Sequence, residues 1–443
     1  MKYLLQMVPI LLLIMACGSG SGDGAETTAS TVAAPAQDPG LDTYRMAMFT
    51  PDWQLIPLQE VDWETATRIP SIGLAYDEQG RVAEAAGLWM GRPSDNVLVA
   101  EHPPLLRFAY DEGHETITFH YADGTPFSMQ GVYGYGVFRD AENGTSELSF
   151  LGEDMEAIPV SGNVWGIRFR PEGDGWFGNI QLDSAGGELQ GPEVMRNRYL
   201  LNDEGRVIAM ELSDASGERI PLGQDIYRVE ISYDSRGNIV ERRRLDENGI
   251  PVEDPDSPGW QTYDVSDEGL TLGFRLLDPQ GGPAEDGYGK HRGEFIYDDY
   301  GRIVETRSYD AEGDPVTVGG VWSTRREYDD AAMTTTVTKI GPDGEPVEIS
   351  GVATTVMVND PVGNVIDLSY FDAAGEPARD PIGVHRYTYS YDDHSRRLDL
   401  SIWEPTGEPG ISSQGHHSEE FIYDGNGNIL STRRYDLEGQ QLQ

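Results

Sequence analysis

The chain has 443 residues, and its 76 aspartates and glutamates against 32 lysines and arginines give a formal net charge of −44. A charge of this sign and size opposes binding to nucleic-acid phosphates, so we expect no nucleic-acid partner. Tyr, Trp, Phe, Ile and Val are spread throughout the body of the sequence, which argues against a disordered chain. The 53 glycines and 27 prolines predict many turns.

The first residues predict a secretory signal. Lys2 precedes an apolar run over residues 4–16, whose 13 residues are too few to span a bilayer, which takes about 20. The sequence Ile-Met-Ala at 14–16 followed by Cys17 resembles the lipobox of bacterial lipoproteins. The resemblance implies a signal peptide over residues 1–16, cleavage before Cys17 and attachment of acyl chains, palmitate among them, to that cysteine. The alternative is an ordinary signal peptide with an incidental cysteine.

The segment after the cleavage point predicts a lipidated tether. Cys17 is the single cysteine of the chain, so we expect neither a disulfide framework nor a thiolate metal site. Residues 18 to about 40 are mainly Gly, Ser, Ala, Thr and Pro, a composition typical of a flexible linker, so we assign residues 17–40 to the tether. Gly18 in place of Asp implies, within the resembled family, an outer-membrane destination. We therefore expect an envelope protein held to the membrane through Cys17, at the periplasmic face or the cell surface.

A Tyr-Asp-x-x-Gly segment recurs along the rest of the chain. The starts from Phe169 to Tyr423 are separated by 32, 32, 32, 32, 31, 30, 33 and 32 residues, whereas the earlier spacings of 34, 28 and 31 drift. We therefore divide the body into an N-terminal cap with degenerate repeats (41–165) and a regular repeat array (166–443). The copies start at Tyr76, Tyr110, Phe138, Phe169, Leu201, Tyr233, Val265, Tyr297, Tyr328, Val358, Tyr391 and Tyr423.

Each repeat predicts a β-hairpin followed by a second turn. Aspartate at the first turn position accepts backbone hydrogen bonds, and glycine supplies the positive φ that closes a type I turn with a bulge. Many carboxylates are thereby turn residues. A second glycine recurs 16 residues after the tyrosine, as at Gly249, and a proline often follows two residues later, as at Pro251. Apolar residues alternate in the flanking segments, as in 225–233, and a period of two indicates strands.

These patterns predict an all-β fold. We expect about twelve 32-residue hairpins side by side in a long, twisted or curled antiparallel sheet, because one apolar face per strand needs cover. Residues 41–70, with Trp53 and Trp63, are expected to plug or cap the first edge of this sheet, since end repeats need protection.

The repeat resembles that of the YD-repeat, or RHS-repeat, proteins. The shared pattern is Tyr-Asp-x-x-Gly-Arg/Asn-Ile/Val, as in Gly80-Arg81-Val82, Gly237-Asn238-Ile239 and Gly301-Arg302-Ile303, and it covers roughly residues 70–443. The resemblance implies spiralling sheets of hairpins, which some members close into a shell around a toxin or peptide and others use in adhesion. This unit is longer than the usual family repeat. The printed chain also stops soon after the turn at 436–439, so we expect the architecture without a toxin domain.

Three histidines hold one register, six residues before the repeat tyrosine: His291, His385 and His417. One hypothesis is a histidine ladder for metal binding or pH sensing. The alternative is a position that favours an amphipathic ring at the start of a strand, because Tyr227 and Trp322 occupy the same slot. We favour the second and predict no metal site.

Other candidates for chemistry are weak. His416 and His417 are the one histidine pair, and Asp424–Asn428 resembles the start of a calcium loop but lacks the later ligands, so we interpret it as a turn. We find no nucleophile elbow, phosphate loop or zinc-protease motif, and we predict no catalytic residues and no cofactor. Five tryptophans are candidates either for sugar stacking or for the core, which we favour: Trp165, Trp176, Trp260, Trp322 and Trp403.

The sequence therefore predicts a lipid-anchored envelope protein with a non-enzymatic binding or scaffolding role through its repeat surface, toward a protein or carbohydrate partner. One alternative is a glycan-processing or metal-dependent surface enzyme, suggested by the tryptophans and histidines. Another is a partner or immunity protein for a secreted effector.

Overall fold

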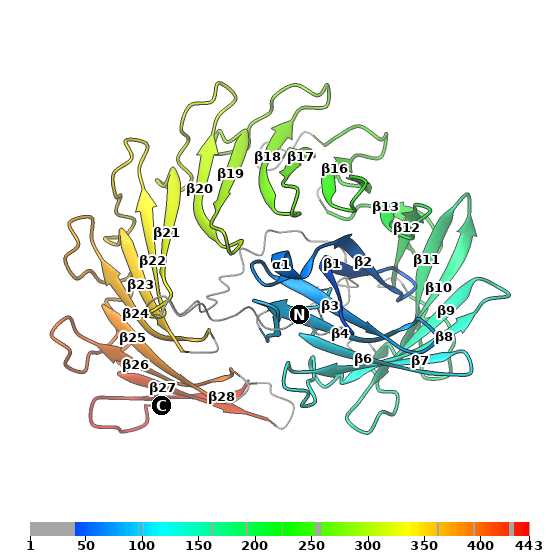
Figure 1. Ribbon diagram of the computed structural model, residues 1–443, viewed down its shortest axis with the longest axis horizontal. Coiled ribbons are helices and arrows are strands. Elements are labelled where there is room, and N and C mark those ends of the chain that lie inside the picture. The colour runs from blue at the N-terminus through cyan, green and yellow to red at the C-terminus, as the bar shows by residue number, and fades with distance from the viewer. Residues whose placement is uncertain are drawn as a thin grey trace. The chain divides into compact units, whose positions relative to one another are not determined.

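The computed structural model describes residues 40–442, with gaps at 96, 101, 161–162, 192–193, 224, 253–257, 361–362, 393–394 and 425–428. The predicted signal peptide, Cys17 and the tether up to residue 39 lie outside the described residues, as does most of the calcium-loop candidate at 424–428. The described chain forms two compact parts, the first ending at Gly287 and the second beginning at Tyr288. Both consist of antiparallel β-hairpins (Figure 1), which confirms the predicted all-β class.

The first part contains eighteen strands and one short helix, α1 (Trp63–Ala66). The strands are β1 (Asp42–Phe49), β2 (Leu55–Glu60), β3 (Ser71–Tyr76), β4 (Val82–Trp89), β5 (Arg92–Pro93), β6 (Leu105–Asp111), β7 (His114–His120), β8 (Gly134–Asp140), β9 (Thr145–Leu151), β10 (Gly166–Gly173), β11 (Trp176–Leu182), β12 (Met195–Leu201), β13 (Val207–Asp214), β14 (Arg219–Ile220), β15 (Arg228–Tyr233), β16 (Ile239–Leu245), β17 (Trp260–Val265) and β18 (Thr271–Leu277).

The second part contains ten strands, which pair in chain order as an antiparallel meander. They are β19 (Arg292–Tyr297), β20 (Ile303–Tyr309), β21 (Ser323–Asp329), β22 (Thr334–Ile340), β23 (Thr354–Asn359), β24 (Val365–Phe371), β25 (Arg386–Tyr391), β26 (Arg397–Trp403), β27 (Ser418–Tyr423) and β28 (Ile429–Tyr435). Its largest fully packed cluster is small and centres on Val384, Tyr387 and Ile402.

The Tyr-Asp-x-x-Gly motif closes its hairpins as predicted, and the hairpin of β15 and β16 shows how. In the hairpin of β15 and β16, Asp234 accepts hydrogen bonds from the backbone N–H groups of Arg236 and Asn238, both at 2.9 Å. Gly237 has a φ of +94°, which a side chain tolerates poorly. The strand register shifts by one residue between Ser232 and Tyr233, which is the predicted bulge.

The second turn of the unit that begins at Tyr233 has the same chemistry. Asp246 accepts from the backbone N–H groups of Asn248 and Ile250, at 2.8 and 2.9 Å. The proline that follows lies opposite the last residue of the preceding strand, as Pro251 does opposite Leu245. The acidic residues of these turns therefore serve the backbone.

The motif also joins several repeats to the one before them. Tyr110 donates its hydroxyl to the carbonyl of Val82 at 2.8 Å, and Tyr233 donates to that of Val207 at 3.0 Å. The arginine of the earlier motif covers the tyrosine ring, as Arg81 covers Tyr110 with 4.1 Å to the ring centroid. The same hydroxyl bond recurs in the second part at Tyr328, Tyr391 and Tyr423. The Tyr and Arg of the motif thus have an inter-repeat structural role.

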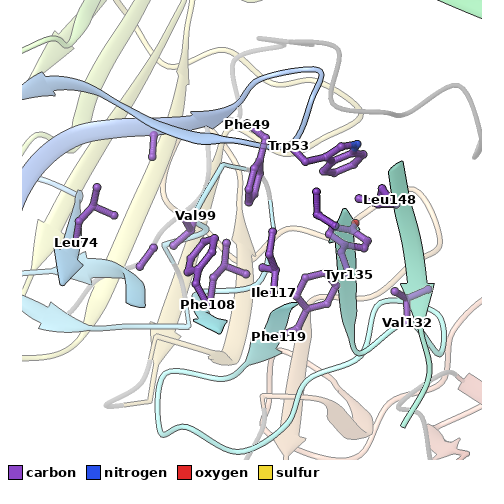
Figure 2. Close-up of a cluster of buried hydrophobic side chains, with 14 of the residues drawn as sticks. Phe49, Trp53, Leu74, Val99, Phe108, Ile117, Phe119, Val132, Tyr135 and Leu148 are labelled. Carbon is purple, nitrogen blue, oxygen red and sulfur yellow. The ribbon is translucent and has the colours of Figure 1, made fainter. Parts of the chain in front are cut away.

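The main core of the first part includes the N-terminal hairpin, which we define as residues 42–60 (β1, β2 and their connection). Trp53 at its tip has a φ of +66° and is 4% exposed. Its ring lies 5.0 Å from that of Tyr135 on β8. Figure 2 shows both rings among the buried side chains of this cluster, with Phe49 and Phe119. Trp53 therefore fills the core rather than standing on the surface.

Polar contacts hold the tip in place. The guanidinium of Arg139 donates to the backbone carbonyls of Asp52 and Trp53, the latter at 2.9 Å, and to the carboxylate of Glu115 at 2.9 Å. The other candidate plug residue, Trp63, packs only partly buried against a smaller cluster of Ala86, Leu88 and Leu105.

The N-terminal hairpin also reaches the turns of much later repeats within the first part (Figure 1). Gln59 donates its backbone N–H to the carbonyl of Arg236 at 3.0 Å and its side-chain amide to the carbonyl of Asp267 at 2.7 Å. Arg68 forms an ion pair with Glu268 at 2.8 Å. Since β1 also pairs with β3 at the start of the sheet, the sheet of the first part curls until its first hairpin meets these turns.

Candidate functional site

Two of the three histidines in register contact the carbonyls of their own loops. His385 Nδ1 lies 2.9 Å from the carbonyl oxygen of Ala378, and His417 Nδ1 lies 3.0 Å from that of Gly410. Each ring is edge-on to an aromatic ring that ends an earlier strand, Phe371 for His385 at 5.7 Å between centroids, and Trp403 for His417 at 6.0 Å. Trp322 meets Tyr309 in the same way at 6.2 Å. His291 is 9% exposed.

This geometry favours the interpretation of the slot as a place for an aromatic or amphipathic ring. Across the described residues, no group of three or more His, Cys, Asp or Glu side chains is arranged to hold a metal ion.

The histidine pair does not converge on one ligand position. His416 contacts Ser412 Oγ at 3.0 Å and Glu419 at 3.3 Å, whereas His417 contacts the carbonyl of Gly410. Burial is the main cause that lowers the pKa of His416. Ser412 is only 4% exposed and begins a turn in which the N–H of Gly415 donates to its carbonyl. A serine, a histidine and a glutamate thus lie together, but the serine lacks the access that a nucleophile needs.

The five candidate tryptophans are half-buried. They therefore lie neither in the core, as predicted, nor on a surface open for sugar stacking. Arg243 covers Trp260 with 4.1 Å to the ring centroid, and Trp403 donates its N–H to Thr388 at 2.8 Å. Trp176 has two guanidinium groups over its ring, those of Arg198 and Arg228. Their neighbours are set by strand register, which explains why the sequence pattern alone placed them wrongly in the core.

The arginines around Trp176 belong to a row that crosses five strands of the first part. Arg170 on β10 pairs with Gly178 on β11, which pairs with Arg198 on β12. Arg198 then pairs with Glu211 on β13, and Glu211 with Arg228 on β15. Residues directly opposite each other in antiparallel strands project from the same face, so these side chains form one continuous polar row.

Glu211 is the anchor of this row. It is 2% exposed, and its carboxylate lies 2.9 Å from Arg198, 3.4 Å from Arg219 and 2.6 Å from Arg228. A buried carboxylate needs such partners, because isolated burial of a charge is costly. One glutamate therefore fixes three guanidinium groups.

A groove with a cavity volume of about 520 Å³ lies beside this anchor. We call it the arginine groove, and its lining residues are Arg170, Pro171, Glu172, Arg196, Arg198, Ser213 and Gly217. Glu188 lies 2.9 Å from Arg170 and 3.2 Å from Arg196. The buried Nε of Arg196 has no hydrogen-bond partner. The three guanidinium groups of the lining are paired with the carboxylates of Glu172, Glu188 and Glu211, so the groove concentrates arginines on a strongly acidic chain.

The groove was missed by sequence reasoning. A signal was present, since Arg-x-Arg occurs at 168–170 and again at 196–198 in a chain poor in basic residues. These arginines alternate on β10 and β12, the two strands that flank β11, so their side chains project from one face.

No protein-family model and no curated protein matches this sequence. A crystal structure of TcdB2-TccC3-Cdc42 is similar with 10% sequence identity and a TM-score of 0.27, covering 87% of this chain and 23% of that chain. A crystal structure of TcdB2-TccC3-TEV has 11% sequence identity and a TM-score of 0.27, and the match covers 84% of this chain and 22% of that chain. A crystal structure of a porin-like protein from Bacteroides uniformis has 10% sequence identity and a TM-score of 0.13, and the match covers 74% of this chain and 92% of that chain. The chain spans less than a quarter of the first two structures, and TM-scores this low carry no functional argument.

Among the described residues, no helix is both long enough and apolar enough to pass through a membrane.

Proposed function

We propose that this chain is a YD-repeat-like lipoprotein of the cell envelope, anchored through Cys17, that binds or scaffolds a partner through its β-repeat surface without enzymatic activity. The observation that carries the proposal is the arginine groove. Its guanidinium groups are held by Glu188 and Glu211 before any partner arrives, and pre-oriented groups lose less entropy on binding.

The non-enzymatic part rests on how the reactive side chains are used. The rings of His385 and His417 contact backbone carbonyls, and Ser412 with His416 is buried in a turn. The aspartates of the turns accept backbone N–H groups, as Asp234 and Asp246 do. These roles are structural, and Ser213, the hydroxyl residue of the groove lining, is only 2% exposed.

The binding role is tested by capture from an envelope extract with the purified full chain as bait. The double variant Arg170→Gln/Arg196→Gln is expected to lose the partners that the native chain captures. Arg275→Gln is the matched control, since Arg275 pairs with Asp264 on the same part of the chain but away from the groove lining. Equal capture by all three would contradict a role for the groove, and hydrolysis of a polysaccharide or peptide panel would contradict the absence of catalysis.

The anchor is tested separately by labelling cells with radioactive palmitate. The native chain is expected to incorporate label and to fractionate with the outer membrane, whereas Cys17→Ser is expected to lose both properties. Label retained by Cys17→Ser, or a native chain found only in the medium, would refute the anchor. Ser21→Ala serves as a control that leaves both Cys17 and the sorting position Gly18 in place.

A further inference from the structure

We infer that the arginine groove binds the carboxylate of a small acidic saccharide, of the uronic acid type, and that Glu172 occupies this carboxylate position when the ligand is absent. The inference rests on the proposed binding function and gives it a ligand class. It starts from the contacts of a single glutamate.

Glu172 reaches Arg198 by crossing over a glycine. Its carboxylate lies 2.8 Å from Arg198 Nε, two strands away from its own backbone. A Cβ atom added at Gly178 would lie 2.3 Å from Glu172 Oε1 and 2.6 Å from its carboxyl carbon. The absence of a side chain at Gly178 is therefore what lets this carboxylate lie in the groove.

Glu172 is also the groove residue that can most easily leave. It lies at a register shift between Pro171 and Gly173 at the end of β10. The three residues that follow, Gly173, Asp174 and Gly175, all have positive φ, which makes a tight tip without core contacts. Arg198 keeps a second partner, the buried Glu211, so releasing Glu172 does not leave Arg198 unpaired.

The remaining lining fits a carboxylate ligand. A guanidinium fork matches a carboxylate in a bidentate manner, and Arg170 and Arg196 are oriented by the single carboxylate of Glu188. The side chain of Arg170 is 38% exposed and open to solvent, so its guanidinium can meet a ligand. The volume of about 520 Å³ is that of a small-ligand site and too small for a folded partner. The exposed Arg170 and the small volume favour a small carboxylate ligand, such as a saccharide acid, over a protein surface.

The test is isothermal titration calorimetry of the purified full chain with trigalacturonate. Galactotriose, an uncharged trisaccharide, is the control ligand. Glu172→Gln removes the competing carboxylate and is expected to tighten trigalacturonate binding by about 10-fold, the scale of one charge-assisted hydrogen bond. Gly178→Ala leaves the net charge unchanged but places a Cβ atom where either carboxylate would lie, so it is expected to weaken trigalacturonate binding. Arg170→Gln is expected to weaken binding by about 10-fold or more. The matched controls Asp264→Asn and Arg275→Gln are expected to change affinity less than about 2-fold.

Three results would overturn the inference. They are equal binding of galactotriose, unchanged affinity in Glu172→Gln and Arg170→Gln, and tighter binding of triglutamate than of trigalacturonate. If Gly178→Ala fails to fold by circular dichroism, the Glu172→Gln result decides. If the chain does not bind trigalacturonate but still captures partners from envelope extract through the groove, the ligand class alone is refuted. If it does neither, the proposed function is refuted as well.

Discussion

The phenolic oxygen of Tyr233 lies 3.0 Å from the carbonyl oxygen of Val207, 26 residues earlier in the chain. Burial raises the pKa of Tyr233 to about 12, so the hydroxyl stays protonated and donates at neutral pH. The bond spans the boundary between two repeats, and Arg206 lies over the same ring at 5.7 Å from its centroid. The tyrosine of the repeat motif is thus a connector between units.

Tyr233→Phe removes this connector while keeping the ring. We expect a loss of about 1 kcal/mol in the free energy of unfolding, because the Val207 carbonyl loses its donor. Chemical denaturation followed by circular dichroism measures it. Tyr288→Phe is the control, since Tyr288 is 64% exposed and its substitution is expected to have little effect. Equal losses in the two variants would contradict the connecting role.

Gln59→Ala tests the contact between the N-terminal hairpin and the later turns. Its side chain donates to the carbonyl of Asp267 at 2.7 Å and accepts from Asn238 at 2.7 Å. Losing both bonds is expected to cost about 1–3 kcal/mol and to expose the hairpin to limited proteolysis. Gln280→Ala, at an exposed turn of the same part, is the control. Unchanged proteolysis in Gln59→Ala would show that the contact does not hold the hairpin.

The turn motif and the strand alternation were predictable because each depends on residues close together in sequence. Asp234 bonds to N–H groups two and four residues ahead, and Gly237 supplies the positive φ within the same turn. Such local signals lie in any single copy, and the 32-residue period then repeats them.

The candidate groove and the curl of the first part were not predictable in the same way. Glu172 meets Arg198 because of strand register and because Gly178 lies between them. Gln59 meets Asp267 across 208 residues of chain, which requires the accumulated twist of many strands. Neither relation has a sequence pattern of its own.

His102 is expected to make the first part sensitive to mild acid. It is buried among aromatic rings, with Nδ1 at 2.8 Å from the carbonyl of Ala100 and Nε2 at 3.3 Å from the hydroxyl of Tyr135. Burial lowers the pKa of His102 below its ordinary 6.5. The unfolded chain therefore binds a proton that the folded chain rejects, so stability is complete above pH 6.5 and falls as the pH drops toward the lowered folded pKa.

The expected slope in that window is at most about 1.4 kcal/mol per pH unit. Denaturation of the native chain and of His102→Gln across pH 7 to 5 measures it. The His102→Gln variant is expected to be less stable at pH 7. It is also expected to lose the part of the pH dependence of stability that comes from protonation of His102. Parallel pH profiles would show that another group is responsible.

Glu211→Gln tests the anchor of the arginine row. Without the buried negative charge, Arg198, Arg219 and Arg228 face one another unpaired at this position. Removing one partner of a buried ion-pair network lowers the free energy of unfolding by about 3–5 kcal/mol. Glu230→Gln is the control, because Glu230 makes one half-exposed contact with Arg228 at 3.5 Å. Thermal unfolding is the measurement, and similar melting temperatures for the two variants would contradict the anchor role.

The bond between Gln59 and Asp267 has a consequence for the order of folding. Contacts separated by 208 residues raise the contact order of the first part, and closing so long a loop is entropically costly before other contacts form. During synthesis the N-terminal hairpin emerges first, yet its partners at 236 and 267 emerge last. Trp53 can pack once β8 with Tyr135 is made, but the edge strand β2 has to wait until the hairpin that contains Asp267 is made. Completion of the first part is a late, slow step that depends on its most distant repeats.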